Sequence, residues 1–320
     1  MVANASGSRS RWNILRPQTI LQNIVQALAA KAFSRKWLNA FYRKLTPSQK
    51  SDFQDSFAQI FRGRCLVQIE EGPWVVDFAG HEITLPLKAE RFWLDWDTAV
   101  SIVGHDIEIK QTYAFLLDSP HRPDLFIDIG ANYGTHSLLF LAHGIDVMTF
   151  EPNVLCHDYF LECCRLNDVE ARIEPVALSD HEGLAELWYP EKDTWLGSTD
   201  AAVKQKLEHT HKIITLKVQQ KRLDDYLPGL RRGRLLVKID TEGHEYEVLK
   251  GALITLEQMR PIVIFETFIG NQRPAVYDLF AAQQYRIAQL PWHSEASAVW
   301  VERSAFFTTP ATNFIALPRA

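Results

Sequence analysis

The chain has 320 residues, and 47% of them are hydrophobic, which suffices for a folded core and excludes wholesale disorder. A pI near 6.1 gives no general nucleic-acid signature. No apolar run reaches the roughly 18 residues of a membrane span, and the four cysteines form no C-x-x-C metal pair. We therefore expect a globular protein of a reducing, cytoplasmic compartment.

The first fifty residues differ from the rest in charge. They contain nine Lys and Arg and no acid, the first acid being Asp52. Apolar side chains at helical spacing predict one helix over Pro17–Ala32 and a second around Trp37–Leu45. Thr46 followed by a proline is typical of the start of a third helix, which we expect to reach about Phe61.

Two interpretations of this basic segment remain open. Residues 11–45 can be a basic amphipathic hairpin that makes peripheral contact with an anionic membrane or a lipid-linked substrate. Alternatively, they form a helical cap or dimer arm that packs on the catalytic domain. The polar face around Gln18, Gln22 and Gln26 is uncharged, which favours the second interpretation.

Short strand-like runs and then a helix lead to the core of the chain. Three short runs separated by glycine-containing turns predict a small antiparallel meander: Cys65–Ile69, Trp74–Phe78 and Glu82–Leu87. A helix is expected over Ile107–Leu117. We place the N-terminal helical and meander segment at residues 1–104 and the catalytic domain at residues 105–320.

The stretch from Leu125 to Asn153 has the pattern of strand, glycine turn, helix and second strand. The turn is D-x-G-x-N-x-G, in which Asn132 replaces the second glycine of the dinucleotide fingerprint and would crowd a pyrophosphate. Asp128 would repel phosphates but suits an ammonium group. Glu151, at the end of the second strand, is placed to bind ribose hydroxyls. This combination is the pattern of S-adenosylmethionine (SAM) methyltransferases.

Further apolar runs predict the rest of a mostly parallel, doubly wound sheet with a closing antiparallel strand. They are Arg172–Leu178, Leu184–Tyr189, Ile213–Val218, Leu235–Ile239, Pro261–Phe265, Tyr285–Leu290 and Asn313–Leu317. The acidic motif at residues 238–245 follows the fourth core strand, and Glu266 follows the fifth. The Gly197-Ser198-Thr199 loop interrupts the alternation and is expected to form a lid or substrate wall.

Several short motifs, in order over roughly residues 105–268, give the chain a resemblance to the FkbM family of SAM-dependent methyltransferases. They are the Asp128–Gly134 turn with Thr135-His136-Ser137, Phe150–Asn153, Ala177–Asp180, and Lys238–Gly251. The resemblance implies a Rossmann-like class I methyltransferase fold, a SAM cofactor, and methylation of a hydroxyl on a sugar, glycan or natural product.

The residues expected to bind SAM contact different parts of the cofactor. Asp128 and the turn would hold the methionine part, and Asp180 with the backbone at Ser179 would reach the adenine. The full expected set is Asp128, Gly130, Asn132, Gly134, Thr135, His136, Glu151, Asn153, Ser179 and Asp180.

An alcohol acceptor must lose its proton, which calls for a general base. The candidates are Asp240, Glu242 and His244. The two carboxylates point the same way if the strand extends one residue further, and the imidazole can titrate near neutrality. Alternatively, Glu242 and Glu245 only complement the N-terminus of a helix. Oxygen ligands of this kind suit Mg²⁺, but SAM chemistry does not require a metal, and we expect no obligatory one.

Two other functions compete with methyl transfer to a small-molecule or glycan acceptor. An NAD-dependent dehydrogenase is disfavoured by Asp128 and Asn132. A non-catalytic SAM-binding or scaffold protein, brought to membranes or partners by its basic helices, would bind SAM without turnover. Nucleic acid is not an expected partner, because the core shows no basic stripe. Tryptophans at 188, 195 and 292 would suit stacking on sugar rings.

Overall fold

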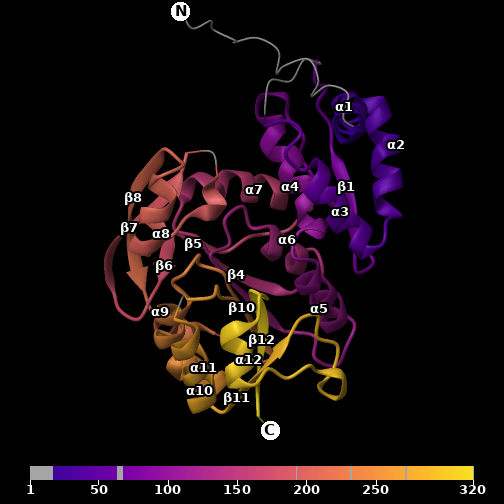
Figure 1. The fold of residues 1–320 in the computed structure, drawn as a ribbon. Helices are drawn as coiled ribbons and strands as arrows, with labels where there is room; N and C mark the ends of the chain where they lie inside the picture. The colour runs from indigo at the N-terminus through magenta and orange to yellow at the C-terminus, as the bar shows by residue number, and fades with distance from the viewer. Residues whose placement is uncertain (1–16, 63–67, 192, 231–232, 271, 320) are drawn as a thin grey trace, which may run out of the picture. The chain divides into compact units, whose positions relative to one another are not determined.

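The computed structural model describes residues 17–62, 68–191, 193–230, 233–270 and 272–319 (Figure 1). The chain divides into two compact units. One is formed within residues 1–77 and 84–107, and the other by residues 78–83 and 108–320. Among the described residues, no helix is long and apolar enough to cross a membrane.

The first unit is mainly helical. Its helices are α1 (Pro17–Ala30), α2 (Ala32–Arg43), α3 (Pro47–Phe57), η2 (Ala89–Arg91) and α4 (Phe92–Gly104). The strands β1 (Trp74–Phe78) and β2 (His81–Leu85) belong to it only in part, because residues 78–83 are assigned to the other unit. The Thr46 side chain accepts a hydrogen bond from the Gln49 N–H, and the Gln49 side chain accepts one from the Thr46 backbone, so the predicted helix start is confirmed. Rings of Tyr42, Trp74 and Trp96 pack together in its core, with centroids 5.5 and 5.2 Å apart.

The glutamine face of α1 points inward. Gln22 donates to the Ser56 carbonyl at 2.9 Å, and Gln26 donates to the Ile60 carbonyl at 3.0 Å. These amides satisfy carbonyl groups at the C-terminal end of α3, which would otherwise lack partners. The uncharged glutamine face is therefore not the solvent face of this helix.

The expected three-stranded meander is a two-stranded sheet of β1 and β2 in the described residues. The first expected strand, Cys65–Ile69, falls largely on residues 63–67, which lie outside the described residues, and its last two residues are not in a strand.

The second unit is built on a seven-stranded sheet in the order β11-β12-β10-β9-β3-β4-β5. Its strands are β3 (Leu125–Ile129), β4 (Asp146–Phe150), β5 (Ile173–Glu174), β9 (Leu235–Ile239), β10 (Ile262–Glu266), β11 (Tyr285–Gln289) and β12 (Asn313–Pro318). All pairs from β10 to β5 are parallel, and β12 is antiparallel to both neighbours. The strand order reverses between β3 and β9, which is where ligands bind in open α/β sheets.

Helices cover both faces of this sheet, with α6 and α7 on one side and α9, α10 and α11 on the other (Figure 1). The helices of the unit are α5 (Ile107–Leu117), α6 (Thr135–Leu141), α7 (His157–Leu166), α8 (Ala201–Glu208), α9 (Glu245–Lys250), α10 (Leu253–Met259), α11 (Arg273–Ala282) and α12 (Arg303–Thr308). Short 3₁₀ turns are η3 (Val154–Cys156), η4 (Thr194–Leu196), η5 (Leu223–Gly229) and η6 (Glu295–Ser297). The predicted doubly wound architecture is confirmed.

The central strands are apolar because both of their faces are covered. Every residue of β9 is buried, including Lys238, which is 3% exposed. Ile127, Val237 and Phe265 belong to one continuous core cluster beneath the helices. This burial on two faces is why the strands occur in the sequence as unbroken apolar runs.

The expected strand over Arg172–Leu178 is wrong as a single element, because Pro175 divides it. β5 pairs with β4 in the main sheet, whereas β6 (Val176–Leu178) belongs to a separate sheet in the order β6-β8-β7. Proline has no N–H to donate to a ladder, so a central strand cannot continue through it. The long hairpin of β7 (Gly183–Pro190) and β8 (Ile213–Lys221) completes this second sheet.

Four helices of the described residues had no counterpart in the sequence predictions: α4, α8, α10 and α12. In α4, nine of the thirteen residues are buried, including Asp95, so apolar side chains occur on all sides and helical periodicity is weak. The short α12 lies between the strands that were expected at Tyr285–Leu290 and Asn313–Leu317.

We predict that Gly251→Ala destabilises the fold. A Cβ at this position would lie 1.9 Å from the Ser179 carbonyl oxygen, which belongs to the backbone and cannot rotate away. We expect a loss of roughly 1–3 kcal/mol or more in the free energy of unfolding, measured by urea denaturation. Gly229→Ala is the control, since its Cβ would meet nothing within 4 Å. Equal stability of the two variants would contradict the close approach.

Candidate active site

The turn after β3 is shaped by backbone conformations that favour glycine. Gly130, Asn132 and Gly134 have φ values of 76°, 48° and 67°. A Cβ at Gly130 would lie 1.8 Å from the carbonyl oxygen of Asp240, and one at Gly134 would lie 2.4 Å from the Phe160 ring. Both glycines are therefore required by close packing, and the first brings the turn against the acidic motif.

Glu151 holds this turn through its carboxylate. One oxygen accepts the Asn132 N–H at 2.6 Å, and the other accepts the Asn153 N–H at 2.7 Å. The residue is 7% exposed, and burial raises the pKa of its carboxyl to about 7, although the two backbone N–H groups oppose that rise. The Asn132 side chain accepts hydrogen bonds from Cys156 and Thr194.

Asp128 is fully buried at the end of β3. Its Oδ2 accepts from the backbone N–H of Ser137 at 3.0 Å and from the Ser137 hydroxyl at 2.8 Å. Lys238 lies opposite it in the strand register and donates to Asp240 at 2.9 Å. Burial raises the pKa of Asp128, while Lys238 and Ser137 lower it. Asp128 thus fixes the start of α6 and has one oxygen, Oδ1, with no hydrogen-bond partner among the described residues.

His136 points toward α5. Its Nε2 lies 3.2 Å from the Lys110 ammonium, and its Nδ1 lies 3.1 Å from the Tyr113 hydroxyl. Because an ammonium can only donate, Nε2 accepts and Nδ1 carries the proton. Sequence reasoning missed Lys110 and Tyr113. Their helical spacing indicates that they share one face of α5, but it does not indicate that this face contacts His136. Thr135, the first residue of α6, is partly exposed beside this buried group.

Ser179 and Asp180 contact the C-terminal part of the acidic motif. The Ser179 hydroxyl lies 3.1 Å from His244 Nε2, and Asp180 contacts Lys250 and His181. The hydrogen bond from Lys250, followed by that from His181, holds the pKa of Asp180 well below its usual range. Both carboxylate oxygens of Asp180 are therefore engaged by basic side chains.

Glu245 stabilises the loop that carries the acidic motif by accepting hydrogen bonds from it. Its Oε1 accepts from the Thr241 N–H and the Gly243 N–H, both at 3.0 Å, and from the Thr241 hydroxyl at 2.9 Å. The residue is 2% exposed, and burial raises the pKa of its carboxyl. Its contacts are those of a residue that satisfies backbone donors near the start of α9.

Three carboxylates converge at the ends of β9 and β10. Asp240, Glu242 and Glu266 each offer an oxygen, and these oxygens all lie within 4.8 Å of one another. All three residues are partly exposed. Since a side chain at Gly130 would meet the Asp240 backbone, the group lies next to the turn after β3.

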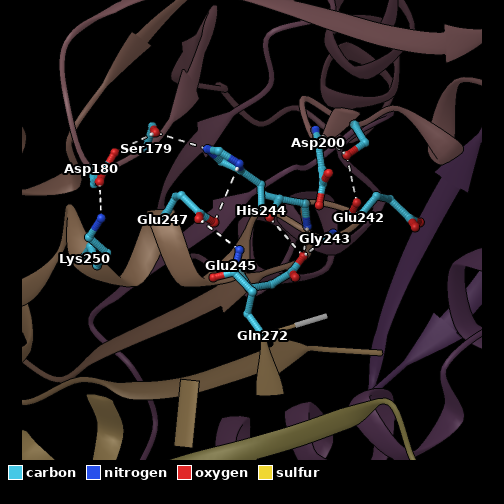
Figure 2. A network of polar contacts seen from close by, with 12 residues as sticks. Ser179, Asp180, Asp200, Glu242, Gly243, His244, Glu245, Glu247, Lys250 and Gln272 are labelled. Carbon is cyan, nitrogen blue, oxygen red and sulfur yellow. Dashed lines mark hydrogen bonds and ion pairs between the residues drawn. The ribbon is translucent and has the colours of Figure 1, made fainter. Parts of the chain in front are cut away.

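His244 is separate from these carboxylates. Figure 2 shows its ring directed toward Ser179, whereas the Glu242 side chain extends away from it. His244 Nδ1 lies 3.8 Å from Glu247. Burial lowers the pKa of His244, and Glu247 opposes that, so the imidazole is expected to be neutral near pH 7. The three candidate bases thus occupy two environments.

The loop after β7 connects the two motifs. Thr194 donates to the Asn132 side chain at 3.1 Å, and Ser198 donates to the Glu242 carbonyl at 2.8 Å. One short segment therefore touches both the turn after β3 and the acidic motif. Trp195 lies between these contacts in the sequence and is partly exposed.

The expectation that Trp292 stacks on a sugar is wrong. The side chain is 1% exposed and packs against Phe115 and His121, with ring centroids 5.5 and 5.6 Å apart. Its backbone N–H donates to Thr112 of α5 at 2.8 Å. Trp188 is partly exposed, with the Lys204 ammonium 4.7 Å from its ring.

The strand order, the glycine turn and the acid at the end of β4 define a class I SAM-dependent methyltransferase. The sequence matches the Methyltransferase FkbM domain over residues 128–287, which is half of the chain. The chain belongs to the FkbM methyltransferase family, and its methyl donor is SAM.

Solved structures give only distant likenesses. A methyltransferase FkbM from Methylobacillus flagellatus is 11% identical with a TM-score of 0.39, covering 71% of this chain and 54% of that chain. A putative transferase from Pyrococcus horikoshii is 12% identical with a TM-score of 0.39, covering 84% and 82%. A SAM-dependent methyltransferase from Agrobacterium tumefaciens is 11% identical with a TM-score of 0.38, covering 80% and 73%. No curated protein matches the sequence.

Two buried polar atoms fit a cofactor at this turn. Asp128 Oδ1 is an acceptor and Asn153 Nδ2 a donor, and neither has a hydrogen-bond partner among the described residues. SAM carries an ammonium group that donates and ring nitrogens that accept, so its chemistry matches both atoms. We propose that Asp128, Glu151 and Asn153, with the backbone of the turn, hold the cofactor.

We predict that SAM binding strengthens as the pH rises. Ribose hydroxyls donate to an ionised Glu151, and with a pKa of about 7 its ionised fraction rises roughly tenfold between pH 6 and pH 8. Calorimetry should show about a tenfold gain in affinity over that range. Glu151→Gln should bind more weakly by roughly 1.5–3 kcal/mol at pH 8 and should lose this gain. Parallel pH profiles for the two proteins would exclude this role for Glu151.

Proposed function

We propose that this methyltransferase acts on a hydroxyl oxygen of a sugar, glycan or natural product. The observation that carries the proposal is the convergence of the Asp240, Glu242 and Glu266 carboxylates beside the turn after β3. An alcohol must lose its proton as it accepts a methyl group, and a carboxylate within reach can take it.

Bound SAM supplies an activated methyl group on a sulfonium, and transfer is an in-line displacement. The contribution of the chain is to position the acceptor, which can supply roughly 7–11 kcal/mol of the barrier. The Lys238 ammonium donates a hydrogen bond to Asp240 and so holds this carboxylate in place. We propose Asp240 or Glu242 as the base.

His244 is better suited to positioning than to proton transfer. Its Nε2 is engaged by the buried Ser179 hydroxyl, and its Nδ1 faces Glu247. These contacts join the loop after β6 to the start of α9. We propose that His244 holds the acidic motif in place, with its role as a second candidate base open to the same mutational test.

The loop after β7 supports an acceptor site beside the carboxylates. It is tied to the turn at Asn132 and to the acidic motif at Glu242, and it carries the partly exposed Trp195. An aromatic face at such a position suits the apolar face of a sugar ring. We propose this loop as a wall of the acceptor site.

The direct test uses SAM with a ¹³C-labelled methyl group and a panel of hydroxyl, amine and carboxylate acceptors. An O-methyl carbon signal, with stoichiometric S-adenosylhomocysteine, would support the proposal. An N-methyl product would replace it with another methyltransferase activity. Tight SAM binding with no turnover on any acceptor would favour the scaffold alternative.

We predict that removing the base lowers turnover and leaves cofactor binding intact. Asp240→Asn or Glu242→Gln should lower kcat by about 10²–10⁴-fold, according to which residue takes the proton. SAM affinity should change little, because neither carboxylate is proposed to hold the cofactor. Glu257→Gln, an exposed acid on α10, is the matched control and should retain wild-type kcat. Wild-type kcat in both site variants would remove these carboxylates from the mechanism.

We predict that metal removal leaves turnover unchanged. The three carboxylates are oxygen ligands of the kind that Mg²⁺ binds, but displacement at a sulfonium methyl needs no Lewis acid. Activity after dialysis against EDTA should stay within about twofold of the untreated enzyme. A loss restored by Mg²⁺ would instead identify the carboxylates as metal ligands.

A further inference from the structure

The α1 helix exposes its apolar side. Ile20, Leu21 and Ile24 are 45–50% exposed, and Leu28 is 38% exposed. The opposite side carries the inward-pointing Gln22 and Gln26 described above. Val25 and Ala29 are buried on that inward side as well, so α1 has apolar residues on both sides, whereas a surface helix in a globular protein turns a polar side to water.

The α2 helix exposes an aromatic stripe. Phe33, Trp37 and Phe41 are 76%, 69% and 58% exposed and recur every four residues, so they lie on one side of the helix. Arg35, Leu38 and Tyr42 are buried on the other side.

We refer to the exposed apolar residues of these two helices, taken together, as the α1–α2 apolar face: Ile20, Leu21, Ile24, Leu28, Phe33, Trp37 and Phe41. The two helices contact each other within the first unit, where Figure 1 shows them in indigo. Seven of the fifteen large apolar side chains that are exposed in the described residues lie on these helices, which have 14 and 12 residues. Single exposed apolar residues are ordinary, but a concentration of this kind marks an interaction surface.

The segment that carries this face is basic, and Glu70 is an acid that contacts it at the α1–α2 junction. Residues 1–50 contain nine basic side chains and no acid. Lys36 and Lys44 are on or just after α2, beside the aromatic stripe in the sequence, and Arg43 is partly exposed. Lys31 forms an ion pair with Glu70 at 3.1 Å, so Lys36 and Lys44 are the basic side chains that we expect to contribute positive charge beside this face.

We propose that the α1–α2 apolar face docks on an anionic lipid membrane. Aromatic side chains, Trp above all, are favoured at the boundary between headgroups and acyl chains, and neighbouring lysines are attracted to anionic headgroups. A second copy of the chain fits less well, because a two-fold interface would bring the same basic residues together. The proposal goes beyond methyl transfer, since it concerns where the enzyme acts and not its chemistry.

The test is flotation of the full-length protein with phosphatidylcholine vesicles that contain or lack phosphatidylglycerol. We expect binding to the anionic vesicles only, weakening as salt is raised. The triple variant Phe33→Ser, Trp37→Ser, Phe41→Ser should bind at least roughly tenfold more weakly. Lys36→Glu with Lys44→Glu should lose the preference for anionic lipid.

Leu184→Ser is the matched control, because Leu184 is a 75% exposed apolar residue on β7, far from these helices in sequence. It should float as the wild type does. All variants should keep wild-type thermal stability and SAM affinity, since the substituted side chains are exposed and belong to no proposed cofactor contact. Failure of methyl transfer would leave this vesicle result unaffected.

Vesicle binding by the triple variant equal to that of the wild type would overturn the proposal. So would the absence of wild-type binding to anionic vesicles. Sedimentation velocity tests the alternative that a second copy of the chain covers this face. If the wild type does not float but forms a dimer, and the triple variant is a monomer, the face is an interface between copies.

Discussion

The site depends on the absence of a side chain at Gly130. A single Cβ there would meet the Asp240 carbonyl oxygen at 1.8 Å. The Asp240 N–H also donates to the Ile129 carbonyl at 3.1 Å, so the ends of β3 and β9 are locked together. Because the glycine turn and the acidic motif share this contact, the residues proposed to hold SAM and those proposed to take a proton are fixed relative to each other.

The buried charged groups of this site are stabilised by ion pairs and by backbone N–H donors. Lys238 lies beside Asp128 in the register and donates to Asp240. Glu151 and Glu245 instead accept backbone N–H groups from tight turns. Burying a carboxylate is costly unless such donors surround it. The raised pKa of Glu151 shows that this compensation is incomplete, as is common where a ligand supplies further partners.

Much of the catalytic unit could be predicted from local sequence. Buried strands such as Leu235–Ile239 are visible as apolar runs because both faces of a parallel sheet are covered. The turn at Gly130–Gly134 follows from glycine spacing, and Glu151 from its distance along one βαβ unit. Pro175 should have divided the predicted strand, since the missing N–H is a local property.

Local sequence was enough to predict most buried strands, the glycine turn and the basic character of the N-terminal helices, because each depends on neighbours along the chain. Which side chains share an environment depends instead on the folded arrangement of distant segments. His244 contacts Ser179, which is 65 residues away, while Glu242 joins Asp240 and Glu266. Likewise, Trp292 is buried against α5, and the α1 glutamines face α3. Periodicity identifies the two sides of an element, but what covers each side is set by contacts between distant segments.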